Sequence, residues 1–225
     1  MSARSGPRSV DSAESRPVSN SDVPWDSGRV VSIRTDTLTS PSGESLRRDV
    51  VVHPGAVGVI CLDDQDRVLV VDQYRHPVGH RLVEPVAGLL DVEDEDYRDA
   101  AARELFEEGA VVATTWHVLV DATTSPGMTS ETLRIYLARG VTAVRDADKF
   151  VGRGEEAHMQ VAWIPLDDLV TDILAGRLHN PTMVMGALAA HTARLRDWAD
   201  LRPADDPWTF RAEMLAAKVH AEAAG

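Results

Sequence analysis

Cysteine is almost absent from this chain of 225 residues, and no long apolar run occurs in it. The one cysteine, Cys61, cannot form an internal disulfide, and its place in the apolar run AVGVICL predicts a small buried side chain. No apolar stretch approaches the roughly 18 residues of a membrane-spanning helix, and the N-terminus lacks the apolar core of a signal peptide. We therefore expect a cytoplasmic protein that does not enter a membrane.

Positive charge is also scarce. The chain has 23 Lys and Arg residues against 36 Asp and Glu residues, which leaves a formal net charge of −13. Nucleic acids and anionic membranes are bound by clustered Lys and Arg, so we expect neither as a partner. The hydrophobic content of 44% is that of a globular protein, and 225 residues are enough for one buried core without a second domain.

Four segments of the chain differ in composition. Residues 1–22 are rich in Ser, Pro and Arg without apolar periodicity and predict a disordered tail. Residues 23–54 hold two strand-like runs around a Pro-Ser-Gly turn and predict a β-hairpin, and residues 55–200 and 201–225 predict a main domain and a helical extension. The expected strands are 29–35, 46–52, 56–62, 68–73, 115–120, 132–139 and 158–165, and the expected helices are 95–108, 166–176, 181–198 and 209–223.

The helix expected at 95–108 has an unusual charge distribution, because its last turn carries Glu104, Glu107 and Glu108. Like charges three or four residues apart repel by a few tenths of a kcal/mol, and each carboxylate at this end of the helix dipole costs about 0.3–1 kcal/mol more. A bound divalent cation would make this cluster of carboxylates favourable instead of repulsive, since Mg²⁺ prefers carboxylate oxygens and is commonly shared with substrate phosphates. A solvated acidic face is the alternative interpretation.

The residues around this helix resemble the Nudix box, G-x5-E-x7-R-E-U-x-E-E-x-G-U, where U is aliphatic. The matching residues are Gly88, Glu95, Arg103, Glu104, Leu105, Glu107, Glu108 and Val111. Six residues rather than five separate Gly88 from Glu95, a spacing that also occurs in ADP-ribose pyrophosphatases of the family. Ala110 stands in place of the second glycine, and because alanine tolerates positive φ poorly we expect strain or a shift at the helix exit.

The resemblance implies an α/β fold, namely a Nudix α/β/α sandwich around a mixed sheet, with the N-terminal β-hairpin added. It also implies a bound Mg²⁺, or Mn²⁺ as the alternative ion. The implied metal ligands are Glu104, Glu107, Glu108 and the backbone carbonyl of Ala87, and the implied catalytic residues are Glu104, Glu108 and either Glu155 or Glu156, which lie in a polar loop and would activate water. Arg103 is expected to anchor the box by pairing with Glu95 or with a carboxylate of the helix.

Five substrate-binding residues follow from the resemblance to the ADP-ribose group: Arg75, Arg48, Glu84, Trp25 and Pro126. The guanidinium of Arg75 suits a substrate phosphate, with a surface ion pair as the alternative. Glu84 would pair with substrate or with a neighbouring subunit. Arg48 is either a strand-edge charge or a residue that reaches the partner's substrate, Trp25 is either a packing residue or a platform for adenine, and Pro126 is either a turn proline or a marker of the subgroup.

Together these features predict Mg²⁺-dependent hydrolysis of the diphosphate bond of ADP-ribose to AMP and ribose 5-phosphate. One alternative is hydrolysis of another nucleoside diphosphate derivative, such as a nucleotide sugar or an oxidised nucleotide. A second is a non-catalytic Nudix-like sensor of ADP-ribose. The hairpin at 23–54 resembles the dimerisation sheet of ADP-ribose pyrophosphatases, so we expect a homodimer that acts on a small molecule.

Overall fold

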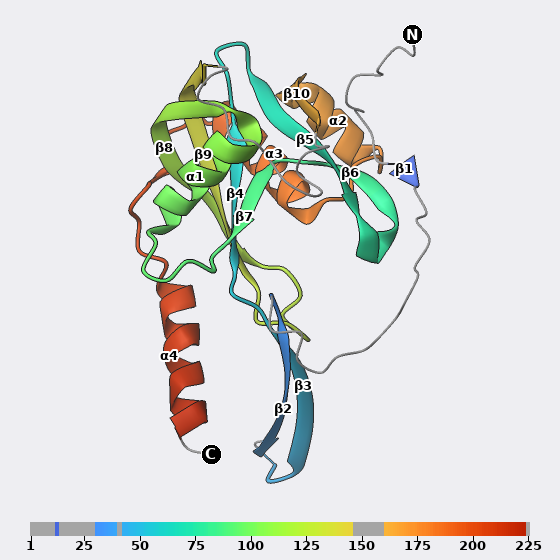
Figure 1. Ribbon diagram of the computed structural model, residues 1–225, viewed down its shortest axis with the longest axis vertical. Coiled ribbons are helices and arrows are strands. Elements are labelled where there is room, and N and C mark those ends of the chain that lie inside the picture. Colours follow the sequence, from blue (N-terminus) through green and yellow to red (C-terminus); the bar gives the residue numbers. More distant parts are fainter. Residues whose placement is uncertain (1–11, 14–29, 40–41, 146–159, 224–225) are drawn as a thin grey trace.

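The computed structural model describes residues 12–13, 30–39, 42–145 and 160–223, which form an α/β structure around a mixed sheet (Figure 1). The strands of this sheet are β4 (Ala56–Cys61), β7 (Val86–Leu89), β8 (Val111–Thr123), β9 (Thr132–Ala143) and β11 (Arg202–Pro203). Their order is β11-β8-β9-β4-β7, in which β4 and β9 are parallel and the other neighbours antiparallel. The α/β class, the mixed sheet and the N-terminal hairpin predicted from the sequence are confirmed.

A second sheet has the order β1-β6-β5-β10. Its strands are β1 (Ser12–Ala13), β5 (Arg67–Arg75), β6 (His80–Glu84) and β10 (Gln160–Pro165), and a 3-10 turn at His76–Val78 separates β5 from β6. The helices are α1 (Tyr97–Gly109), α2 (Leu166–Leu174), α3 (Pro181–Leu195) and α4 (Thr209–Ala223). None of the helices in the described ranges is both long enough and apolar enough to cross a membrane.

The two faces of the central sheet contribute to two separate hydrophobic cores. Val57 and Val59 of β4 and Tyr136 of β9 pack on the side of α1, whereas Ile60 and Ile135 of the same strands pack on the side of α2 and α3. Successive side chains of a strand point to opposite faces, so continuous apolar runs serve both layers. Helix α1 and helix α3 therefore cover opposite faces of the sheet (Figure 1).

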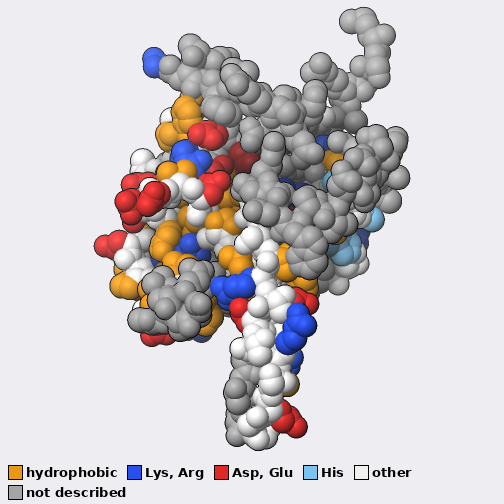
Figure 2. Space-filling view, turned by 60° about the horizontal axis from the view of Figure 1, so that its bottom comes forward, with side chains coloured by type: hydrophobic (Ala, Val, Ile, Leu, Met, Phe, Trp, Pro, Cys, Tyr) orange, Lys and Arg blue, Asp and Glu red, His pale blue; other side chains and the backbone are white. Residues whose placement is uncertain are grey.

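The N-terminal hairpin is a separate two-stranded sheet of β2 (Ser32–Thr39) and β3 (Ser45–Val52) that projects from the domain (Figure 1). It stands out as a column with both acidic and basic side chains (Figure 2). At its base, the Val51 N–H donates to the Met128 carbonyl at 2.8 Å and the Val51 carbonyl accepts from the Ser130 N–H at 3.0 Å. Because an isolated two-stranded sheet is marginally stable in water, this attachment to the loop between β8 and β9 supports the hairpin.

Several boundaries differ from those predicted. Helix α1 begins at Tyr97 rather than residue 95, because the Asp96 carboxylate caps it and accepts from the Arg98 N–H at 2.8 Å. Strand β8 is longer than predicted, since it pairs with β9 over almost its whole length, and β6 and β7 were not predicted as strands. Within the segment predicted as a disordered tail, Ser12–Ala13 pairs with β6, and the rest of that segment lies outside the described residues.

Candidate active site

Helix α1 positions the acidic residues by burying one face against the central sheet. Ala100, Ala101 and Leu105 are buried in the core on that side, and Gly109 ends the helix in contact with Leu69. The next residue, Ala110, has φ 52° and ψ 38°, which is the left-handed conformation that favours glycine. The strain expected from the sequence at this position is therefore present in the backbone.

The Glu104 side chain lies directly over the backbone of β7. A Cβ atom at Gly88 would stand 2.1 Å from Glu104 Cδ and 2.2 Å from Glu104 Oε1, distances that real Cβ atoms do not show. A side chain at residue 88 would therefore displace the Glu104 carboxylate, and the small size of Gly88 rather than its φ allows this close approach. The first glycine of the motif and its first helix-end glutamate form one packed unit.

The Glu108 side chain reaches the same strand, where its Oε2 accepts a hydrogen bond from the Ala87 N–H at 3.3 Å. Strand β7 is at the edge of the five-stranded sheet, paired with β4 on its other side. The N–H and C=O of one residue in an antiparallel strand point to the same side. The Ala87 carbonyl therefore faces the edge where Glu104 and Glu108 converge.

Arg103 holds the acidic turn together. Its Nε and one terminal nitrogen donate to the two oxygens of Glu95 at 2.9 Å each, and its other terminal nitrogen donates to Glu104 Oε1 at 2.6 Å. The same nitrogen is 3.9 Å from Glu107 Oε2. The paired hydrogen bonds that Arg103 donates to Glu95 lower the pKa of Glu95 and raise the pKa of Arg103. Arg103 anchors the motif as predicted, and its charge offsets part of the repulsion among the helix carboxylates.

Arg75 and Glu84 pair with each other across β5 and β6. Arg75 Nε donates to Glu84 Oε1 at 3.0 Å and a terminal nitrogen donates to Oε2 at 2.6 Å. The Glu84 side chain is 2% exposed, whereas that of Arg75 is 44% exposed. A buried carboxylate thus fixes the orientation of a guanidinium that still reaches solvent, and Glu84 lies only three residues before Ala87 in the chain.

Arg48 and Pro126, which are far apart in the sequence, line the same pocket of about 360 Å³. The pocket lies between the hairpin and the loop after β8, and its lining residues are Asp36, Arg48, Asp49, Val50, Pro126, Gly127, Met128 and Thr129. The hydrogen bonds from Val51 to this loop bring the two segments together. The structure therefore combines two of the predicted substrate-binding residues in one cavity.

Residues 52–184 match the family described as NUDIX domain. The chain belongs to the Nudix family. An ADP-ribose pyrophosphatase of Mycobacterium tuberculosis (strain ATCC 25618 / H37Rv) is 40% identical over 191 residues, which cover 85% of this chain and 90% of that protein. A methanol dehydrogenase activator of Bacillus methanolicus is 33% identical over 159 residues, with coverage of 71% and 84%.

A solved structure described as an ADP compounds hydrolase has a TM-score of 0.61 and 18% identity to this chain, and it covers 88% of this chain and 99% of its own. At that identity the likeness concerns the fold alone. It agrees with the layered Nudix arrangement built above from the two hydrophobic cores.

Nudix hydrolases generally need a divalent metal ion such as Mg²⁺. The donors at the edge of β7 fit this requirement, because the carboxylates of Glu104 and Glu108 and the carbonyl of Ala87 are all oxygen ligands. Within the described ranges, no three acidic, His or Cys side chains already surround one point. Two carboxylates and a carbonyl suit Mg²⁺, which usually takes one or two carboxylates together with water and substrate phosphates.

Three predicted site residues, Trp25, Glu155 and Glu156, lie outside the described residues. Conversely, sequence reasoning missed a group that joins the C-terminal extension to the domain. Trp208 lies with its ring 4.8 Å from the Arg134 guanidinium and 5.3 Å from the Tyr97 ring, and Arg211 is buried beside it. The sequence signal was weak: one arginine inside an apolar strand and one tryptophan before a helix.

Proposed function

We propose that this Nudix protein hydrolyses the diphosphate bond of ADP-ribose and releases AMP and ribose 5-phosphate, with Mg²⁺ as cofactor and Mn²⁺ as the alternative ion. The observation that carries the proposal is the convergence of Glu104 and Glu108 on Ala87 and Gly88, within a Nudix motif whose acidic residues and Arg103 are all present. The identity of the substrate is inferred from the 40% identical relative, an ADP-ribose pyrophosphatase of which the match covers 90%.

The carboxylates of Glu104 and Glu108 and the Ala87 carbonyl would hold the metal at the edge of β7, with Glu107 as a further ligand. When bound, the ion neutralises the diphosphate and lowers the pKa of a coordinated water. Arg103 keeps Glu104 in place through the hydrogen bond at 2.6 Å and through its own pairing with Glu95. Glu155 or Glu156 orients or deprotonates the attacking water.

The remaining predicted residues bind the substrate. Arg75 donates hydrogen bonds to a phosphate, and Glu84 presents the guanidinium in the required orientation. Arg48 and Pro126 contact the substrate from the pocket that they share. Trp25 stacks on adenine.

We also propose a homodimer in which the hairpin of residues 23–54 is the dimerisation element. The hairpin projects from the domain, and the Val31 and Ile33 side chains on it are exposed. A second copy would supply the cover that a two-stranded sheet lacks by itself. Light scattering distinguishes this dimer from a monomer. We place the protein in the cytoplasm, because a chain with one cysteine has no internal disulfide that requires an oxidising compartment.

The test of the activity is to incubate the purified chain with ADP-ribose, with Mg²⁺ and with EDTA, and to identify the products by chromatography and ³¹P NMR. AMP and ribose 5-phosphate that appear only with the metal support the proposal. A panel of nucleotide sugars and oxidised nucleotides, compared by kcat/KM, decides the substrate, and a clear preference for one of them would replace ADP-ribose. Tight binding of ADP-ribose without any product would instead indicate a sensor.

A further inference from the structure

The C-terminal extension is attached to the domain through one buried guanidinium, that of Arg211 in the first turn of α4. Arg211 is 5% exposed. One terminal nitrogen donates to Thr132 Oγ1 at 2.6 Å and the other donates to the Pro54 carbonyl at 2.6 Å. The guanidinium carbon is 5.5 Å from the ring centre of Tyr97 and 5.4 Å from that of Trp208. A single side chain thus contacts segments from both ends and the middle of the domain.

Each of these contacts is made where a part of the site joins the domain. Pro54 lies in the link between β4 and the hairpin strand that carries Arg48. Thr132 is the first residue of β9, directly after the loop that carries Pro126. Tyr97 is the first residue of α1, the helix of the acidic motif. Arg211 therefore connects the hairpin, the pocket loop and the catalytic helix.

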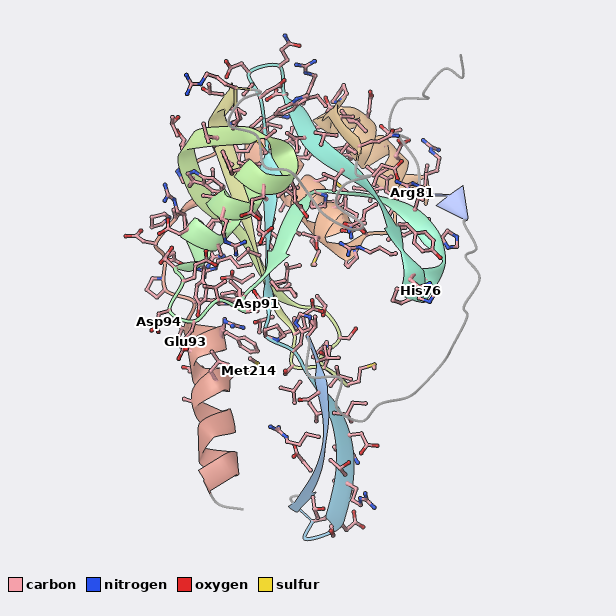
Figure 3. All side chains as sticks on the ribbon, viewed as in Figure 1. His76, Arg81, Asp91, Glu93, Asp94 and Met214 are labelled. Carbon is pink, nitrogen blue, oxygen red and sulfur yellow. The ribbon has the colours of Figure 1, made fainter. Side chains whose placement is uncertain are left out.

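Gly55 extends this connection to the segment that leads into α1. A Cβ at Gly55 would stand 2.3 Å from a terminal nitrogen of Arg211, so the guanidinium packs directly on this backbone. The Gly55 carbonyl accepts from the Leu90 N–H at 3.0 Å. Leu90 begins the loop between β7 and α1, which also carries Asp91, Glu93 and Asp94 (Figure 3).

Two features of the surroundings of Arg211 oppose stability, although the Tyr97 and Trp208 rings stabilise its positive charge. Among the described residues, the guanidinium of Arg211 contacts a hydroxyl, a carbonyl and two rings but no carboxylate, and its Nε is buried without a hydrogen-bond partner. By contrast, the equally buried Arg134 makes paired hydrogen bonds to Asp121 at 2.7 and 2.9 Å. A buried charge without a counterion and an unmade hydrogen bond both cost free energy, and an apolar side chain would avoid both costs. What Arg211 does provide is directed hydrogen bonds to two separate segments.

We propose that Arg211 is a positioning residue that holds the hairpin link and the pocket loop in register with α1, and thereby governs the binding of the substrate. The guanidinium suits this role because its rigid fork donates in two directions at once, whereas an ammonium group on a flexible stem does not. The kinetic part of this inference rests on the proposed function. The structural part is independent of it.

The test uses full-length Arg211→Met and Arg211→Lys, with Arg196→Met as a matched control because the Arg196 side chain is exposed and, within the described part of the chain, pairs with Asp200. Hydrogen exchange is followed by mass spectrometry in the native protein. In Arg211→Met we expect exchange of the amides at 50–55 and 125–132 to rise about tenfold, with β5 and α3 unchanged. Arg211→Lys should lie between Arg211→Met and the wild type, and Arg196→Met should match the wild type.

Kinetics provide the second measurement, with ADP-ribose and saturating Mg²⁺. For Arg211→Met we expect KM to rise about tenfold while kcat changes less than about threefold. The carboxylates of α1 stay in position, whereas the substrate-binding residues on the hairpin and the pocket loop are displaced. A merely structural residue would lower the amount of active enzyme and leave KM unchanged.

The proposal is overturned if exchange in Arg211→Met rises equally in β5 and α3, or does not rise at the link and the loop. An unchanged KM in a variant whose link has loosened overturns the role in substrate binding. If the wild type does not hydrolyse ADP-ribose, the proposed function fails. The exchange experiment then still decides whether Arg211 positions the three segments.

Discussion

The Glu104 carboxylate lies against the backbone of Gly88, so close that a Cβ at residue 88 would stand 2.1 Å from Glu104 Cδ. The helix and the strand of the Nudix motif are therefore fitted to each other at one point. Because Glu108 accepts a hydrogen bond from the adjacent Ala87 N–H, the same contact brings a second carboxylate to the strand edge. Substitutions at Gly88 or Glu108 should therefore reduce the catalytic rate without preventing the chain from folding.

Replacement of Gly88 by alanine should displace the Glu104 carboxylate. The added methyl group overpacks the contact, which typically costs about 1–3 kcal/mol of unfolding free energy, and we expect kcat to fall about a hundredfold. Urea unfolding and steady-state kinetics measure the two effects. Wild-type turnover in Gly88→Ala would show that the position of Glu104 over β7 is not needed for the reaction.

Replacement of Glu108 by glutamine should separate activity from stability. The amide oxygen can still accept from the Ala87 N–H, and loss of one charge at the end of α1 relieves repulsion and dipole cost by about 0.3–1 kcal/mol. We expect kcat to fall about 10²–10³-fold while the unfolding free energy stays equal or rises. Glu93→Gln, in the exposed loop before α1, is the control and should keep wild-type values. Undiminished turnover of Glu108→Gln at saturating Mg²⁺ would count against Glu108 as a metal ligand.

Replacement of Ala110 by glycine should stabilise the protein. Ala110 has φ 52°, and an L-residue in this left-handed conformation costs about 1–2 kcal/mol. Glycine removes this strain, but it also makes the unfolded chain more flexible, which offsets part of the gain in stability. We expect a gain of about 0.5–1 kcal/mol and a higher Tm by scanning calorimetry. Ala102→Gly, within α1, should instead lose about 1 kcal/mol. A lower Tm in Ala110→Gly would mean that the helix exit is not strained.

The pairing of Glu95 with Arg103 should make stability depend on acid pH. The hydrogen bonds from Arg103 hold the folded-state pKa of Glu95 below its usual value near 4.5. The stabilisation is therefore complete above about pH 4.5 and is lost as the pH falls through the lowered pKa of the folded state. Urea midpoints measured between about pH 3 and pH 7 should show Glu95→Gln less stable than the wild type at pH 7 and similar to it at the acid end. A gap that stays constant across this range would contradict the pairing as its cause.

Helix α1 shows most clearly which features could be predicted from the sequence. The spacing of Glu104, Glu107 and Glu108 predicted the acidic end of the helix, because residues three and four apart are neighbours on a helix. The resemblance of the whole stretch to the Nudix box implied the family. The strain at Ala110 was predicted because alanine stands there in place of the second glycine of the Nudix box. The start of the helix was missed by two residues, since the Asp96 cap depends on a local hydrogen bond that competes with a longer helix.

The pairings across the molecule could not be read in this way. Arg75 was expected to bind a substrate phosphate or to form a surface ion pair, and Glu84 to pair with substrate or with a neighbouring subunit. The structure pairs the two residues with each other, because β5 and β6 fold back on each other. Arg48 and Pro126 meet in one pocket only through the hydrogen bonds at the base of the hairpin. In each case the register of strands, which was not predicted, decides which side chains meet.

By itself, the sequence determined the acidic helix, because its pattern involves residues close together in the chain. The resemblance of this stretch to the Nudix box implied the family and the layered α/β class. The tertiary structure alone decided that Gly88 makes room for a carboxylate and that Arg211 contacts Pro54, 157 residues away. Such contacts depend on how strands and helices pack. The sequence between Pro54 and Arg211 does not indicate that these two residues are close in space.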